Sequence, residues 1–293
     1  MNDTQSDRRP WLQIAVLGAA LACGIVAMGC AKKSSATVFA KSDGYTGYTT
    51  LPDQSTVITG VGIFVGPSDI VNDGTETCIE LAGVDQCVTQ PTGKFCSQEG
   101  AKADLIVVDG VVVDVVCYPP PTPANTTTVV PDNGNVDVPQ NANNTVIVFD
   151  SSTDGEPIKG NITVDGNNVA IYGNGPDKTI IEGDLHIDGN NARVRGVTVT
   201  GNVTWGLNGG ALLFSVVQGN VTVDKNNIIV SAVDVWGNVT VSGNNAILVA
   251  NRVAGNWQIT GNGEFCDGNY AFVDDNQDNK IQSTEIGDLL TCN

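Results

Sequence analysis

The chain has 293 residues, of which 41% are hydrophobic and 5% aromatic, and it carries a formal net charge of −18 with a pI of about 4.1. This length accommodates one large domain or two modest ones. An acidic surface disfavours nucleic acid and anionic lipid headgroups and favours cations. The sequence has no basic patch with interleaved aromatic residues, so we expect no nucleic-acid partner.

Residues 1–30 read as an export signal. Two arginines at Arg8 and Arg9 precede an apolar stretch from Trp11 to Met28, which ends in Ala-Met-Gly-Cys at Cys30. This pattern resembles the lipobox of bacterial lipoproteins, and the resemblance implies that Cys30 is acylated and becomes the mature N-terminus. Cys23 is a weaker candidate, and an uncleaved membrane helix is the alternative. We therefore expect an exported protein, lipid-anchored at the outer membrane or cell surface.

A small β module follows the signal. Residues 31–46 are small and polar and predict a tether, and residues 47–118 are strand-like. Within this module, Asp109-Gly110 separates the apolar runs 103–108 and 111–117, which is a strong hairpin signal.

Six cysteines remain when Cys23 and Cys30 are set aside, and an even number in an exported chain predicts disulfides. Their spacings of 9, 9 and 21 in the first module lack the C-x2-C pattern of a metal site. We expect two bridges in the first module, with their pairing left open, and one at the C-terminus. The six are Cys78, Cys87, Cys96, Cys117, Cys266 and Cys292.

Residues 119–128 form a Pro-rich linker. Residues 129–263 are then expected to form a parallel β-helix, with Thr145–Phe149 as its first strong strand and residues 264–293 as a C-terminal cap. The basis is a repeat of Gly-Asn-Val-Thr or a close relative. It begins at Gly160, Gly183, Gly201, Gly219, Gly237 and Gly255, with one interval of 23 residues and four of 18.

Four rows of the repeat are apolar and predict the interior. Positions 3 and 5 alternate with a polar position 4, as in a strand, and positions 12 and 17 are also apolar. The spacing of positions 5, 12 and 17 favours a right-handed helix over a left-handed one built from hexapeptides. Asn recurs at positions 2 and 8, which predicts turns and side-chain ladders. Glycosylation of the N-V-T sites is the alternative.

The segment Gly173–Ile181 resembles the G-x-G-x-x-K-T-x-I stretch of pectinesterase-type, pectin-lyase-like β-helices. The resemblance implies a parallel β-helix but no catalysis, because the G-x-x-D-F-I-F-G motif of that family has no counterpart here.

The segment Asp274–Glu285 resembles the 12-residue loop of EF-hands and dockerin repeats. Oxygen donors at loop positions 1, 3, 5, 7, 9 and 12, with Lys280 acting through its carbonyl, suit Ca²⁺. Asn279 takes the usual Gly position, and Ile286–Leu290 is expected to form a short exiting helix. A solvated acidic turn is the alternative. The predicted ligands are Asp274, Asn276, Asp278, Lys280, Gln282 and Glu285.

Catalytic residues are harder to find. His186 faces outward on a strand, Arg193 and Arg195 lie on the same rung, and several Asp residues share position 6. Glycan-cleaving β-helices gather such groups in one groove. Positions 11 and 13 are apolar in the middle coils and predict a covered outer face, buried by the N-terminal module, a second subunit or flanking loops.

The favoured function is a non-enzymatic surface lipoprotein, a β-helix scaffold for envelope structure, adhesion or carbohydrate binding with a structural Ca²⁺ site. Its expected partners are the membrane, through the lipid anchor, and carbohydrate or envelope proteins. The alternative is a pectin-lyase-like polysaccharide lyase, hydrolase or esterase.

Overall fold

The computed structural model describes residues 70–72, 76–81, 84–89, 102–108, 111–118, 122–129, 134–150, 152 and 154–292. The chain divides into two compact units, 1–33 and 34–293, and every described residue belongs to the second. The predicted export signal, Cys30, the tether and Cys96 lie outside the described residues. Within the described part, no helix is long and apolar enough to cross a membrane.

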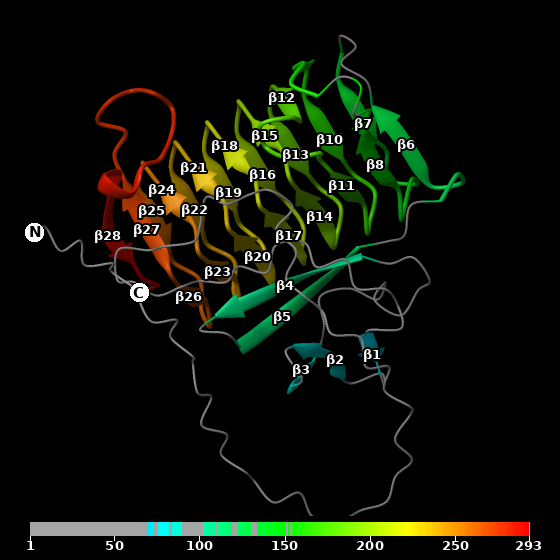
Figure 1. The fold of residues 1–293 in the computed structure, drawn as a ribbon. Coiled ribbons are helices and arrows are strands. Elements are labelled where there is room, and N and C mark those ends of the chain that lie inside the picture. The colour runs from blue at the N-terminus through cyan, green and yellow to red at the C-terminus, as the bar shows by residue number, and fades with distance from the viewer. Residues whose placement is uncertain are drawn as a thin grey trace, which may run out of the picture. The chain divides into compact units, whose positions relative to one another are not determined.

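The predicted β-helix is confirmed as a solenoid with three parallel sheets, which run side by side along the row of rungs in Figure 1. Each full rung gives one short strand to each sheet. Sheet I has seven strands: β7 (Val136–Val138), β10 (Ile162–Val164), β13 (Leu185–Ile187), β16 (Val203–Trp205), β19 (Val221–Val223), β22 (Val239–Val241) and β25 (Trp257–Ile259).

Sheets II and III have eight strands each. Sheet II contains β6 (Thr126–Val129), β8 (Val146–Phe149), β11 (Ala170–Tyr172), β14 (Ala192–Arg195), β17 (Gly210–Leu213), β20 (Ile228–Ser231), β23 (Ile247–Val249) and β26 (Phe265–Asp267). Sheet III contains β9 (Ile158–Lys159), β12 (Ile180–Glu182), β15 (Thr198–Val199), β18 (Val216–Val217), β21 (Asp234–Val235), β24 (Arg252–Val253), β27 (Asn269–Phe272) and β28 (Ile286–Leu290).

The solenoid begins one rung earlier than the repeat indicates. Gly134-Asn135-Val136-Asp137-Val138 has the repeat pattern, and Val136 lies opposite Ile162 in the register of β7 and β10. The interval from Gly134 to Gly160 is 26 residues, so it does not match the later period.

The predicted interior rows are confirmed. The side chains at positions 3, 5, 12 and 17 form one continuous hydrophobic cluster along the solenoid axis, for example Val221, Val223, Val230 and Val235 of a single rung. These β-branched residues suit short strands, because their stiff side chains pack well on a pleated surface. At the last rung the row ends in Trp257 and Cys266, which are only partly buried.

The predicted Asn ladders are confirmed too. In the position-2 row, the Asn220 amide side chain and backbone N–H both donate to Asn202 Oδ1, at 3.0 Å each. In the position-8 row, the Asn244 N–H donates to Asn226 Oδ1 at 2.8 Å. The left-handed conformation occurs at position 9 instead, for example at Asn227 with φ of 60°. The position-8 side chains therefore join rungs, and the sharp turn is made by the next residue.

The predicted hairpin is confirmed as β4 (Lys102–Val108) paired antiparallel with β5 (Val111–Tyr118). A second antiparallel sheet contains β1 (Ile70–Asn72), β2 (Glu76–Leu81) and β3 (Val84–Thr89). In the register of β2 and β3, Cys78 lies directly opposite Cys87.

The predicted covered face is confirmed on the outside of sheet II. Ala211, Leu213 and Ile229 point outward yet are at most 2% exposed. They belong to a second hydrophobic cluster that also contains Ile106 of β4 and Val116 of β5. The hairpin of the N-terminal module therefore contributes to the cover.

Candidate functional site

The predicted calcium loop joins two strands. It runs from the end of β27 to the start of β28, with a single 3-10 turn, η2 (Ser283–Glu285), before β28. The expected exiting helix at Ile286–Leu290 is wrong, because this segment pairs antiparallel with β27 and becomes the last strand of sheet III. The Val273 N–H donates to the Glu285 carbonyl at 3.0 Å and closes the loop at its base. The loop is therefore a hairpin connection at the C-terminal end of the solenoid.

Backbone N–H groups organise the predicted ligand side chains. Asp274 accepts from the N–H of Asp278 at 3.2 Å and of Asn279 at 3.1 Å. Asn276 Oδ1 accepts from the Asp278 N–H at 2.9 Å, and Asp278 Oδ1 accepts from the Lys280 N–H at 2.9 Å. These bonds curl the loop around the side chain at position 1.

Two further residues complete the turn. Asn279 has a φ of 58°, so Asn adopts the left-handed conformation for which Gly is usual at this position. Glu285 is 8% exposed, and its Oε2 accepts from the Gln282 N–H at 2.8 Å. The residue at position 12 is thereby held at the loop's base, while positions 3, 5, 7 and 9 are exposed.

The donor set suits a hard cation, because it offers carboxylate, amide and carbonyl oxygens and no nitrogen or sulfur. Within the described residues, no three His, Cys, Asp or Glu side chains are gathered as they would be around a bound ion. The Asp278 carboxylate accepts from Gln282 Nε2 at 3.1 Å. Binding an ion would therefore require the loop carboxylates to come closer together.

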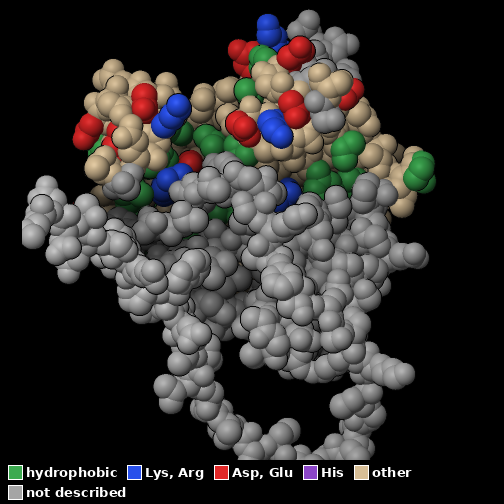
Figure 2. Space-filling view, in the orientation of Figure 1, with side chains coloured by type: hydrophobic (Ala, Val, Ile, Leu, Met, Phe, Trp, Pro, Cys, Tyr) green, Lys and Arg blue, Asp and Glu red, His purple; other side chains and the backbone are tan. Residues whose placement is uncertain are grey.

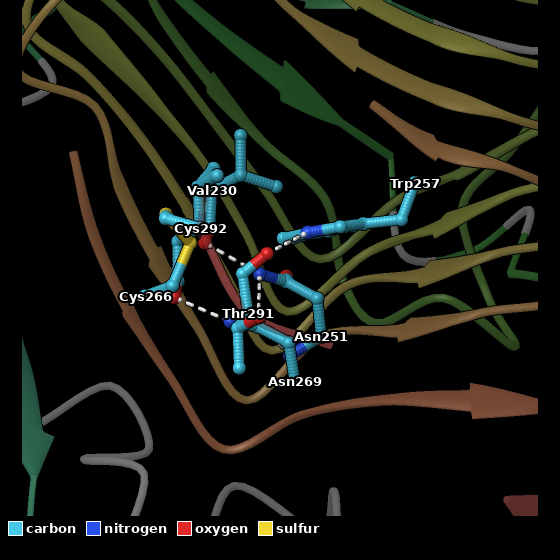
Figure 3. The surroundings of a disulfide bond; sticks show 8 residues. Val230, Asn251, Trp257, Cys266, Asn269, Thr291 and Cys292 are labelled. Atoms are coloured by element: carbon cyan, nitrogen blue, oxygen red, sulfur yellow. Dashed lines mark hydrogen bonds between the residues drawn. A yellow bond between two sulfur atoms is a disulfide. The ribbon is translucent and has the colours of Figure 1, made fainter. Parts of the chain in front are cut away.

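The C-terminal tail closes the end of the core. The predicted disulfide joins Cys266 of β26 to Cys292, with Cα atoms 5.6 Å apart and 26 residues of separation (Figure 3). The Trp257 indole N–H donates to the Thr291 carbonyl at 3.0 Å. Leu290 and Cys292 pack against the main hydrophobic cluster. The tail thus lies across the last rung, and β28 is fastened by the loop at one end and by the bridge at the other.

Among the described residues, the charged groups near His186 do not converge in one groove. His186 Nε2 lies 2.8 Å from Asp188 Oδ2 on sheet I, and each side chain is 46% exposed. Arg193 and Arg195 belong to β14 of sheet II, where both are buried. The rung bends between the two sheets, so sharing a rung does not bring these residues together.

The structure also contains a small hollow at the N-terminal end, lined by Asp150, Asp154, Glu156, Asn174 and Lys178 among others. It is open to solvent, and its own volume of about 10 Å³ is far below the usual size of a ligand pocket. The backbone N–H of Ser152 donates to Asp150 at 2.9 Å and lowers the pKa of that carboxyl. On the face shown in Figure 2, acidic side chains are interspersed with Lys and Arg.

Sequence reasoning missed a buried ion pair. Arg252 Nε and a terminal guanidinium nitrogen each donate to Asp234 at 2.7 Å, and both residues are at most 6% exposed. They are register partners on the outer side of sheet III. Both residues occupy position 16 of consecutive coils, 18 residues apart, so an alignment of the coils places these opposite charges next to each other.

The remaining predicted site residues divide into two groups. The register of β2 and β3 brings Cys78 and Cys87 opposite each other, and Cys117 lies in β5. Cys30 and Cys96 lie outside the described residues. Comparisons with protein-family models, with curated proteins and with solved structures found no match to this chain.

Proposed function

We propose that this protein is a non-enzymatic scaffold of the bacterial envelope, anchored by lipid at Cys30 and capped at its C-terminal end by a calcium-bound hairpin. The observation that carries the proposal is the loop Asp274–Glu285. Its N–H groups already converge on Asp274, and its position-12 residue, Glu285, is buried where β28 begins. The ion would supply positive charge that draws the loop oxygens together.

Calcium has a clear structural task at this place. An open solenoid end exposes backbone edges and core side chains, and repeat proteins need capping elements there. β28 covers the edge of β27, and the tail covers the core beside Trp257 and Cys266. An ion that joined Asp274 before β28 to Glu285 at its start would hold this cap in place.

The outer surface of sheet I is better suited to binding than to catalysis. The outer row of sheet I holds Thr163, His186, Thr204, Thr222 and Thr240 in register, which offers hydroxyl groups for envelope carbohydrate or protein. His186 pairs with Asp188, and the arginines of its rung lie buried on another sheet. Among the described residues, no observation favours the lyase, hydrolase or esterase alternative.

The test compares thermal unfolding of the full chain with and without Ca²⁺, alongside Asp274→Asn and Asp275→Asn. Both variants remove one negative charge, but only Asp274 holds a ligand position. We expect Ca²⁺ to raise the melting temperature of the parent and of Asp275→Asn and to leave Asp274→Asn unchanged. An equal rise in all three proteins, or in none, would refute the calcium cap.

A further inference from the structure

At each end of the solenoid, one sheet extends one strand further than the other two, and we call this a step. The extended sheet differs between the two ends. At the N-terminal end, β6 extends sheet II one strand beyond β8, whereas sheets I and III end with β7 and β9. At the C-terminal end, β28 extends sheet III beyond β27, whereas sheets I and II end with β25 and β26. Figure 1 shows β6 and β28 at opposite ends of the row of rungs. Within the described residues, each end therefore lacks a strand in the sheet where the other end has an extra one.

The outward-facing backbone groups at the two ends of sheet II are complementary. The Asn125 carbonyl accepts from the Val146 N–H, and the Val129 carbonyl accepts from the Asp150 N–H, so these two residues face β8. Backbone groups alternate along a strand, so Thr126 and Thr128 face away from β8. On β26, Phe265 and Asp267 bond to the chain around β23, which leaves the N–H and carbonyl of Cys266 facing outward.

The register of sheet II fits these groups together. Phe265 ends the row that starts with Thr126 and Val146. If a second copy continues that row, its Thr126 lies beside Phe265 and its Thr127 beside Cys266. In a parallel pair, a residue bonds to both neighbours of its partner. The Cys266 N–H then meets the Thr126 carbonyl, and the Thr128 N–H meets the Cys266 carbonyl.

Exposed apolar side chains lie on the C-terminal edge strands of sheets II and III. Among the described residues the exposed large hydrophobic side chains are Phe265 at 41%, Val273 at 62% and Leu289 at 54%. Phe265 lies on β26 and Leu289 on β28, so a stacked copy would bury both. In sheet III, exposed Asp288 of β28 would approach exposed Lys159 of β9, which carries the opposite charge. An edge strand presents a row of N–H and C=O groups that can pair with another chain.

Sheet I takes no part in this stacking. Pro139 follows β7 and has no N–H to donate. A proline at such a position disfavours pairing with a further strand. At the other end the tail holds the layer beyond the last rung, with Thr291 bound to the Trp257 indole. The contact between copies is therefore confined to sheets II and III.

We propose that the chain binds a second copy of itself head to tail, through a shared rung in which β6 of one copy and β28 of the other lie in the same layer. The contact joins two different surfaces and continues the row of rungs along the solenoid axis, so its repetition produces an open filament. This assembly goes beyond the scaffold role, because it would arrange the chain in linear arrays.

The test uses the full chain in one nonionic detergent and measures its mass by sedimentation over a range of concentrations. Thr128→Pro blocks the N-terminal step, since it removes an outward N–H and leaves the bonds to β8. Phe265→Asp blocks the C-terminal step, and Val273→Asp is its control on the same end but outside the edge strands. We expect an open series of species for the parent and Val273→Asp, and monomer for each blocked variant.

A mixture of the two blocked variants gives the sharpest outcome. Thr128→Pro keeps an intact C-terminal step and Phe265→Asp keeps an intact N-terminal step, so together they should form one heterodimer and nothing larger. Lys159→Glu and Leu289→Asp supply a second block for each end if the first variant misfolds by circular dichroism. A parent that stays monomeric, a closed dimer that survives Thr128→Pro, or a mixture without heterodimer would each overturn the proposal.

Discussion

Trp257 of the last rung and Thr291 of the tail are joined by a hydrogen bond of 3.0 Å from the indole N–H to the carbonyl oxygen. The bond links residues 34 apart and lies beside the bridge between Cys266 and Cys292 (Figure 3). It shows that the C-terminal residues are part of the folded end of the solenoid, although no repeat motif includes them.

The bridge should contribute more to stability than the indole bond. Closing about 27 residues is worth roughly 3 kcal/mol by loop entropy, whereas a single hydrogen bond contributes about 0.5–1.5 kcal/mol. We therefore expect Cys292→Ser to lower the free energy of unfolding by about three times as much as Trp257→Phe, which keeps an apolar ring. Urea titration followed by circular dichroism measures both. Equal midpoints for the two variants would contradict this ranking.

Asn251 should be far more costly to remove than an Asn of the exposed ladders. It is 1% exposed, its side chain donates to the Val230 carbonyl at 2.8 Å, and its Oδ1 accepts from the Val233 N–H at 3.1 Å. Asn251→Ala leaves buried backbone groups unpaired, which costs about 1–3 kcal/mol per group. Asn238→Ala is the matched control, because water can replace its exposed ladder bonds. If both variants unfold at the same urea concentration, burial does not determine how much these Asn ladders contribute to stability.

Removing one partner of the ion pair of Asp234 and Arg252 should destabilise the fold strongly, whereas replacing both partners with apolar residues should destabilise it much less. Arg252→Met leaves a buried carboxylate without its main partner, and the expected loss is about 3–5 kcal/mol. The double variant Asp234→Leu with Arg252→Met removes both charges and should recover most of that loss. The double-mutant cycle is measured by urea unfolding. A double variant less stable than Arg252→Met would show that the pair itself is not the dominant interaction.

The fold was predictable because each rung repeats the same pattern of apolar and polar residues. Apolar positions 3, 5, 12 and 17 recur in coils of 18 residues, so the interior follows from the sequence alone. The repeat motif at Gly134 was not recognised, although it lies within the predicted β-helix, because extra residues after Pro139 and a larger insertion between β8 and β9 change the interval. The fate of Ile286–Leu290 was not predicted either, since five residues with apolar positions 1, 4 and 5 match a helix as well as a strand.

The candidate sites also include some that could be predicted from the sequence and some that could not. The bridge of Cys266 and Cys292 follows from two cysteines that flank one loop, and it is present. The separation of His186 from Arg193 could not be derived, because it depends on the bend between sheets I and II. The buried pair of Asp234 and Arg252 depends on what covers sheet III, which a repeat pattern does not describe.

The register of β2 and β3 predicts one pairing that the spacing of the cysteines left open. Cys78 and Cys87 lie opposite each other on antiparallel strands, where Cα atoms are about 4.5–5.5 Å apart, within the range of a disulfide. We expect a bridge between them and, by remainder, one between Cys96 and Cys117. Peptide mapping of the non-reduced chain by mass spectrometry identifies both. Recovery of Cys78 linked to Cys96 or Cys117 would contradict the register.

Amide hydrogen exchange in β28 tests the central claim most directly, because it reports on the cap itself. The residues to follow are Ile286–Leu290, with Val221–Val223 of β19 in the middle of sheet I as an internal reference. If calcium holds the hairpin, Ca²⁺ slows exchange in β28 of the parent and of Asp275→Asn, leaves β19 unchanged, and has no effect on Asp274→Asn. Equal exchange in β28 with and without saturating Ca²⁺ would contradict the account.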